Sequence, residues 1–129
     1  MASVVIVCTD ADLGTVMALG CQRSGHTTVT YGDYATGLDA VRATGPALFV
    51  VRIMRSEPAG SRVCAAAKAD PVARRVPLLV VTADPDIECV EADTVLRLPF
   101  GLKDFGRCVD AILGRAPAVS RGELTVSGG

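Results

Sequence analysis

The sequence predicts an α/β fold built on a five-stranded parallel sheet. Two observations lead to it: five short apolar or β-branched runs follow one another along the chain, and segments with helical periodicity stand between them. Continuous apolar runs of this length are typical of strands buried on both faces of a parallel sheet. Strands that alternate with helices form such a sheet through right-handed crossovers. With 129 residues, half of them hydrophobic, the chain can form one domain with a sizeable core.

The first strand and helix are the clearest elements. Val4–Cys8 is an unbroken apolar run and predicts a buried strand. Asp10 or Asp12 can then cap a helix, which ends at Ser24-Gly25. Its inward stripe recurs every three or four residues, at Leu13, Val16, Met17, Gly20 and Cys21.

The next elements follow the same alternation. Thr27–Tyr31 is rich in β-branched residues and predicts the second strand. A second helix then ends at Gly45-Pro46, and Ala47–Ile53 predicts the third strand, followed by a loop over Met54–Gly60. The stripe of this second helix lies at Tyr34, Leu38 and Val41.

The remaining elements complete the sheet. Ser61–Ala69 predicts a third helix that ends near Asp70-Pro71, and Pro77–Thr82 predicts the fourth strand. Val95–Arg97 predicts a short fifth strand. A final helix runs to about Arg115, with its inward stripe at Leu102, Phe105, Cys108, Val109 and Ile112.

The composition excludes several classes of function. Lys and Arg total 13 against 14 Asp and Glu, so nothing predicts a nucleic-acid-binding surface within this segment. No apolar run approaches the roughly 20 residues of a membrane span. Met1-Ala2-Ser3 leads directly into the first strand, without the basic start of a signal peptide. We therefore expect a cytoplasmic protein that does not contact membranes.

Cysteine and histidine give no sign of a metal site. The five cysteines, at positions 8, 21, 64, 89 and 108, form no C-x-x-C pair, and their odd number argues against a closed disulfide set. We expect most to be buried as small hydrophobic residues, with Cys89 the most exposed thiol. His26 has no Cys or Asp at metal-ligand spacing, which favours a structural or exposed role. We expect no cofactor, no metal and no catalytic residue.

Taken in order, four segments resemble the receiver domain of response regulators, over nearly all of Val4–Arg115. Val4–Leu13 aligns with the family's first strand and its acidic pair, and Pro46–Cys64 aligns with the stretch around the phosphoacceptor. Residues 69–83 resemble the third helix, loop and fourth strand, and Leu96–Phe100 resembles the lysine-proline-phenylalanine corner. The resemblance implies a flavodoxin-like (CheY-like) doubly wound sheet of order 2-1-3-4-5, with its functional crevice at the carboxyl ends of the strands. It also implies a cis peptide before Pro99.

The end of the chain resembles a different module. Ala116-Pro117-Ala118 has the composition of a linker, and Arg121–Val126 resembles the opening strand of the winged-helix DNA-binding domain in OmpR/PhoB-type regulators. We therefore assign residues 1–115 to a receiver-like domain, and residues 116–129 to a linker and the start of a winged-helix domain. The alternative is a polar tail on a stand-alone receiver.

Most of the chemical groups of a typical receiver are replaced. The family uses two carboxylates for Mg²⁺, an aspartate acceptor, a hydroxyl and a lysine. By the resemblance, the acidic pair falls on Cys8 and Thr9, the acceptor on Arg52 and the lysine on Leu98. Of the five groups only Thr82 remains, so we expect a degenerate phosphorylation pocket.

Arg52 is the most informative of these replacements, because a guanidinium offers no oxygen nucleophile. A partly buried guanidinium needs partners, so we expect Arg52 to pair with Asp10. The alternative is an arginine that extends into solvent.

The switch and dimer positions are altered too. Val95 occupies the place of the family's aromatic switch residue. The seven residues of Asp84–Val90, with Pro85 among them, leave room for about one or two turns. We therefore expect the family's fourth helix to be short or absent, and any homodimer to use an altered face.

These observations favour a non-enzymatic regulatory domain that works without phosphorylation and controls an attached winged-helix domain, and through it DNA. One alternative is a sensor of a metabolite or antibiotic, held in a pocket lined by Cys8, Arg52, Thr82 and Leu98, where an anion would suit Arg52. A stand-alone protein-interaction receiver is another alternative. Phosphorylation of a displaced acceptor, Asp10, would lack a metal site.

Overall fold

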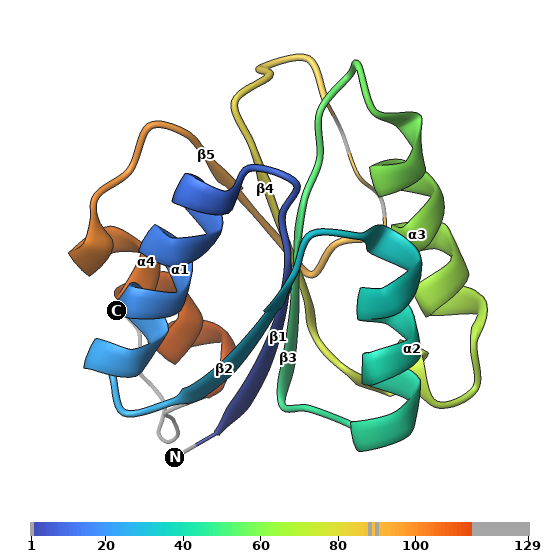
Figure 1. Ribbon diagram of the computed structural model, residues 1–129, viewed down its shortest axis with the longest axis horizontal. Coiled ribbons are helices and arrows are strands. Elements are labelled where there is room, and N and C mark those ends of the chain that lie inside the picture. The colour runs from blue at the N-terminus through green and yellow to red at the C-terminus, as the bar shows by residue number, and fades with distance from the viewer. Residues whose placement is uncertain (1, 88, 90, 115–129) are drawn as a thin grey trace.

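The computed structural model describes residues 2–87, 89 and 91–114 and confirms the predicted fold (Figure 1). Five parallel strands form one sheet of order β2-β1-β3-β4-β5. The strands are β1 (Ser3–Val7), β2 (Thr27–Tyr31), β3 (Leu48–Arg52), β4 (Leu78–Thr82) and β5 (Thr94–Arg97). Helices cover both faces, as a doubly wound sheet requires.

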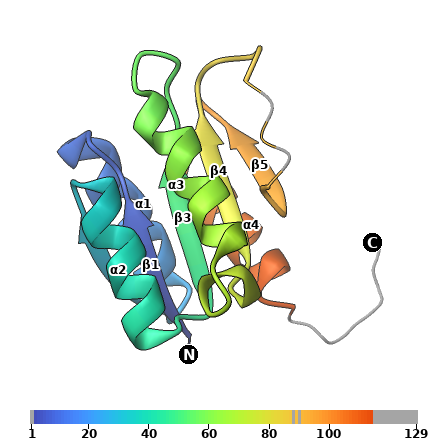
Figure 2. The same ribbon diagram turned by 90° about the vertical axis from the view of Figure 1, so that its right-hand side faces the viewer.

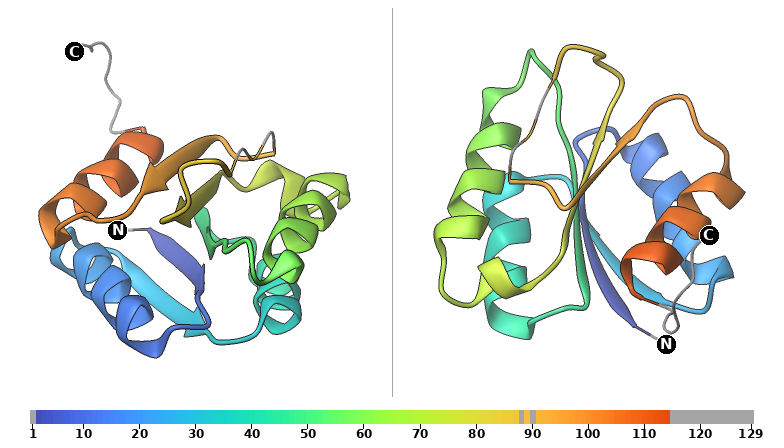
Figure 3. Two further views of the ribbon diagram at one scale, coloured as in Figure 1. Left: turned by 90° about the horizontal axis from the view of Figure 1, so that it is seen from above. Right: turned by 180° about the vertical axis from the view of Figure 1, so that it is seen from behind.

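The helices form two layers. On one face lie α1 (Ala11–Arg23) and α4 (Leu102–Ile112), and on the other lie α2 (Tyr34–Thr44) and α3 (Pro58–Ala69), as Figure 3 shows from above and behind. Figure 2 shows α2 and α3 in front of the strands. A short 3-10 helix, η1 (Ala73–Arg75), joins α3 to β4.

The sheet separates two hydrophobic cores. Successive side chains of a strand point to opposite faces, so Val5 and Val7 of β1 pack toward α2 and α3, whereas Val4 and Ile6 pack toward α1 and α4. Both sets are buried. A strand covered on both faces has no polar alternation, which is why its sequence is continuously apolar.

Helix α1 begins as predicted, and Met17, Gly20 and Cys21 of its expected stripe are buried. The Asp10 carboxylate caps the helix by accepting hydrogen bonds from the N–H groups of Asp12 and Leu13, at 3.0 and 3.2 Å. The expectation for Val16 was wrong, because its side chain is 39% exposed. Gly20 packs against α4, where an added Cβ would stand 3.1 Å from the Phe105 ring.

Several element boundaries differ from the prediction. β1 ends at Val7, one residue before Cys8. α3 begins at Pro58, three residues before the predicted start at Ser61. Proline favours the first turn of a helix because its missing N–H needs no partner there. The predicted linker and winged-helix start, residues 116–129, lie outside the described residues.

No helix forms between β4 and β5 in the described part of that connection, residues 83–87, 89 and 91–93, which agrees with the expected loss of the fourth helix. Two arginines hold the connection. Arg97 donates to the carbonyl oxygens of Asp84 and Ile87, at 2.7 and 3.0 Å. Arg55 pairs with the carboxylate of Asp84 at 3.1 Å and with that of Asp86 at 3.3 Å.

The corner after β5 has the backbone geometry that the resemblance implied, since the Leu98–Pro99 peptide is cis.

The helices are short. Among those described, none is both long and apolar enough to cross a membrane.

Candidate functional site at the carboxyl ends of the strands

The predicted site residues gather at one edge of the sheet. Parallel strands end at the same edge, and ligand crevices of such sheets lie beyond their carboxyl ends. Arg52 is the last residue of β3 and Thr82 the last of β4. Cys8, Thr9 and Asp10 follow β1 directly, and Leu98 follows β5 directly.

Arg52 pairs with Asp10, as expected. Its Nη1 lies 3.6 Å from Asp10 Oδ2, and its side chain is only 15% exposed against 49% for Asp10. The alternative, an arginine extended into solvent, is therefore wrong. Asp10 divides its carboxylate between two tasks, since Oδ1 caps α1 while Oδ2 faces the guanidinium. Arg52 Nε is buried and has no hydrogen-bond partner among the described residues.

Cys8 is a buried thiol whose Sγ donates to the Asp10 carbonyl oxygen at 3.2 Å. Burial raises the pKa of the Cys8 thiol above its usual range, against the opposing effects of its hydrogen bond to the Asp10 backbone and of the Arg52 charge. A thiol with a raised pKa is protonated at neutral pH and is a poor nucleophile and a poor metal ligand. Cys8 therefore acts as a packing residue.

Glu57 and Tyr34 belong to the site, although sequence reasoning missed them as site residues. Glu57 Oε1 accepts hydrogen bonds from Thr9 Oγ1 at 3.0 Å and from the Tyr34 hydroxyl at 2.8 Å. The Tyr34 hydroxyl also lies 3.1 Å from the Arg52 carbonyl oxygen. Burial, followed by the nearby Glu57 carboxylate, raises the pKa of Tyr34. Glu57-Pro58 at the start of α3 was the signal that could have indicated this position.

Thr82, Leu98 and Val95 are held by packing. The Thr82 side chain is completely buried, and its Oγ1 accepts a hydrogen bond from the Asp84 N–H at 3.2 Å. Leu98 is partly buried against the core on the α1 and α4 side. Val95, at the switch position, packs against the opposite core, so no aromatic ring stands beside Thr82 at this position.

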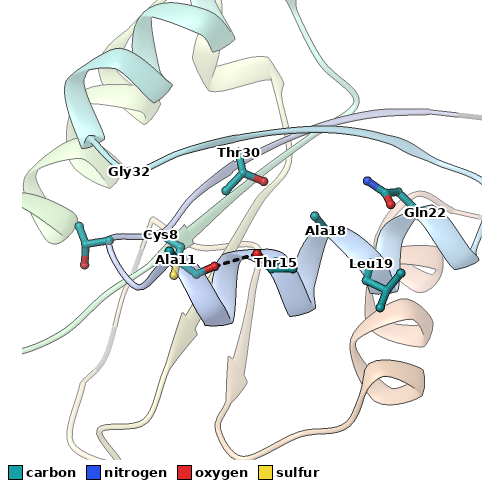
Figure 4. Close-up of a pocket in the computed structure, with 9 residues that line it drawn as sticks. Cys8, Ala11, Thr15, Ala18, Leu19, Gln22, Thr30 and Gly32 are labelled. Atoms are coloured by element: carbon teal, nitrogen blue, oxygen red, sulfur yellow. Dashed lines mark hydrogen bonds between the residues drawn. The ribbon is translucent and has the colours of Figure 1, made fainter.

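The predicted pocket residues line at least two separate hollows. Arg52 and Thr82 line a cavity of about 380 Å³, together with Ile53, Met54, Arg55, Ser56, Ala83 and Asp84. Cys8 and Thr9 instead line a groove of about 480 Å³ between α1 and β2 (Figure 4). Leu98 lines neither of them. Among the described residues, Cys8 and Leu98 are thus not part of the lining of the cavity that Arg52 and Thr82 share.

The residues of this edge do not fit the Mg²⁺ that the fold implies. Mg²⁺ requires several hard oxygen ligands. Here the Thr9 hydroxyl is bound to Glu57, the Asp10 carboxylate faces a guanidinium, and Cys8 offers a thiol. Within the described residues no three His, Cys, Asp or Glu side chains gather closely enough to hold a metal ion.

No family model matches the sequence, and no curated protein matches it either. Its structure does match solved structures. A response regulator receiver protein from Burkholderia phymatum superposes with a TM-score of 0.72 and 27% identity, over 92% of this chain and all of that one. The chemotaxis protein CheY4 of Vibrio cholerae matches with a TM-score of 0.77 and 17% identity, over 87% of this chain and 98% of that one.

A larger protein also contains a similar domain. NtrX from Brucella abortus, solved in complex with ADP, matches with a TM-score of 0.74 and 19% identity. The match covers 87% of this chain but only 26% of that one. The structural neighbours are thus receiver domains of response regulators, and this chain has their CheY-like fold.

Proposed function

We propose that this chain is a regulatory, non-enzymatic receiver domain of a response regulator that works without phosphorylation. The observation that carries the proposal is the pair between Arg52 and Asp10. Phosphoryl transfer to a receiver needs an oxygen nucleophile and cations that stabilise the charge on the phosphoryl oxygens. At the acceptor position this chain has a guanidinium that is already engaged by a carboxylate.

Asp10 is a poor substitute acceptor for the same reason. One of its oxygens accepts from the first turn of α1, and the other faces Arg52. Attack on phosphorus would require it to give up both interactions, without the Mg²⁺ that would offset the cost. We therefore propose that the Arg52–Asp10 pair holds one fixed arrangement of this edge.

For the output we propose an attached winged-helix domain that binds DNA in the cytoplasm. The resemblance of Arg121–Val126 to the first strand of such a domain supports this. NtrX, in which a domain similar to this chain makes up about a quarter of the protein, offers a parallel for a receiver joined to further domains.

The test is incubation with acetyl phosphate and Mg²⁺, read by intact-protein mass spectrometry, beside thermal unfolding with beryllium fluoride and Mg²⁺. We expect no phosphoryl adduct and no shift in melting temperature. An adduct that disappears in Asp10→Asn would overturn the proposal and identify Asp10 as the acceptor.

One observation favours a second candidate function, the sensing of a small anion. Arg52 Nε is buried without a partner among the described residues, and Arg52 lines a cavity of about 380 Å³ that Arg55 and Thr82 also line. A carboxylate or phosphate in this cavity would pair with the Arg52 and Arg55 guanidinium groups. Inorganic phosphate and sulfate should then raise the melting temperature of the wild type and of the exposed control Arg62→Met, but not of Arg52→Met. Equal responses in all three would exclude this candidate.

A further inference from the structure

We propose that the edge strand β2 pairs with β2 of a second copy of this chain, so that two sheets join into one. β2 forms the edge of the sheet opposite β5. The proposed dimer therefore does not rest on the proposed independence from phosphorylation.

Strand β2 lacks the usual protection of an edge strand. Natural edges carry charges, proline or bulges, because their unpaired backbone groups otherwise recruit another strand. β2 has the sequence Thr-Thr-Val-Thr-Tyr, without charge or proline, and pairs in register with β1 alone. Its β-branched and aromatic residues favour strand pairing. The opposite edge strand, β5, carries the charged Arg97.

The backbone groups of β2 alternate between β1 and the open edge. The Thr27 N–H donates to the Ala2 carbonyl at 2.8 Å, and the Tyr31 carbonyl accepts from the Cys8 N–H at 3.0 Å. Backbone groups alternate in direction along a strand. Thr28 and Thr30 therefore direct their N–H and C=O groups away from β1, toward the open edge.

These outward groups are arranged symmetrically about Val29, and this points to a second copy as the partner. In an antiparallel pairing with Val29 opposite itself, Thr28 of each copy meets Thr30 of the other and exchanges N–H and C=O bonds with it. The two Val29 residues then form the non-hydrogen-bonded pair, in which side chains approach most closely. Val29 is 54% exposed, so this contact would cover apolar surface.

The helix beside β2 supports the same arrangement. The groove of about 480 Å³ between α1 and β2 is lined by Thr30, Ala18, Leu19 and Gln22 (Figure 4). The two-fold axis of this pairing is perpendicular to the joined sheet. It therefore places the two α1 helices antiparallel on the same face of the sheet. Each acidic first turn, with Asp12, then lies toward the basic last turn of the other copy, with Arg23. Opposite charges and helix dipoles are thus matched.

The experiment is multi-angle light scattering coupled to size-exclusion chromatography of the whole 129-residue chain, over a range of concentrations. We expect a mass near twice the 13.3 kDa of one chain. Val29→Lys should weaken the dimer more than about tenfold, because two ammonium groups would face each other across the axis. The matched control is Val72→Lys, since Val72 is 50% exposed and lies outside β2.

A second measurement does not depend on a charge substitution. Thr28→Pro removes an outward N–H while leaving the ladder to β1 intact, as edge strands tolerate. The variant should be folded by circular dichroism and monomeric by light scattering. In the wild type, exchange of the Thr28 and Thr30 amide protons should slow as concentration rises. A wild-type monomer at all concentrations would overturn the proposal, as would a dimer that survives both β2 variants.

Discussion

The Arg52–Asp10 pair can be measured with a double-mutant cycle of Asp10→Asn and Arg52→Met. Asparagine caps helices as well as aspartate does, so Asp10→Asn removes the charge and keeps the cap of α1. At the 3.6 Å separation of Nη1 and Oδ2, the Coulomb attraction is about 5 kcal/mol at an effective dielectric constant of about 20, and about 1 kcal/mol in water.

The net value lies near the lower figure, because Asp10 is 49% exposed and the pair is only partly shielded from water and salt. We expect a coupling free energy of about 1 kcal/mol, which is near the upper end of exposed ion pairs. Asp10→Ala should cost about 1 kcal/mol more than Asp10→Asn, since it also removes the cap.

The assay is urea unfolding of the four proteins in the cycle, at low and at high salt. A coupling that decreases with salt is expected, since the pair is partly exposed. A coupling indistinguishable from zero at low salt would refute the idea that Asp10 compensates the charge of Arg52.

Three other predictions concern the fold around the site. Gly37→Ala should lower the free energy of unfolding, measured by urea titration, by about 1–3 kcal/mol. Although alanine has the better helix propensity, its methyl group would overlap the stiff side chain of Val7. Tyr34→Phe should cost about 1–2 kcal/mol in the same titration, because Glu57 loses a half-buried hydrogen bond. Burial raises the pKa of Cys21 to about 12. At a pH above the ordinary thiol pKa, unfolding therefore releases a proton, and the free energy of unfolding should fall as pH rises from about 9 to 12. Cys21→Ala should flatten this decline, which thermal unfolding at several pH values measures.

The sheet could be predicted from the sequence because its central strands are buried on both faces. Val4–Val7, Leu48–Val51 and Leu78–Val81 have no polar residue to interrupt them, and few folds other than a covered parallel sheet produce this pattern in a chain of this length. The contact of Arg52 with Asp10 could be predicted as well, because a partly buried charge needs a partner and few carboxylates lie at that edge.

Further features depend on packing that local patterns do not record. Val16 has helical spacing but is 39% exposed, whereas Gly14, outside the predicted stripe, is buried. Glu57 joins the site only because α3 begins at Pro58 and because the hydroxyl of Tyr34, 23 residues earlier, reaches it. Cys8 also lines a groove against α1 and β2 that the spacing of the sequence does not indicate.

The hydrogen bonds of Glu57 connect three separate parts of the site. One carboxylate oxygen accepts from Thr9, after β1, and from Tyr34, at the start of α2, while Glu57 itself stands before α3. Displacing this carboxylate removes the acceptor of the Thr9 hydroxyl and leaves the Tyr34 hydroxyl only the Arg52 carbonyl oxygen. A ligand or partner that moved one of these segments would therefore strain or break its hydrogen bonds to the others. This coupling through Glu57 requires neither a metal ion nor a phosphoryl group.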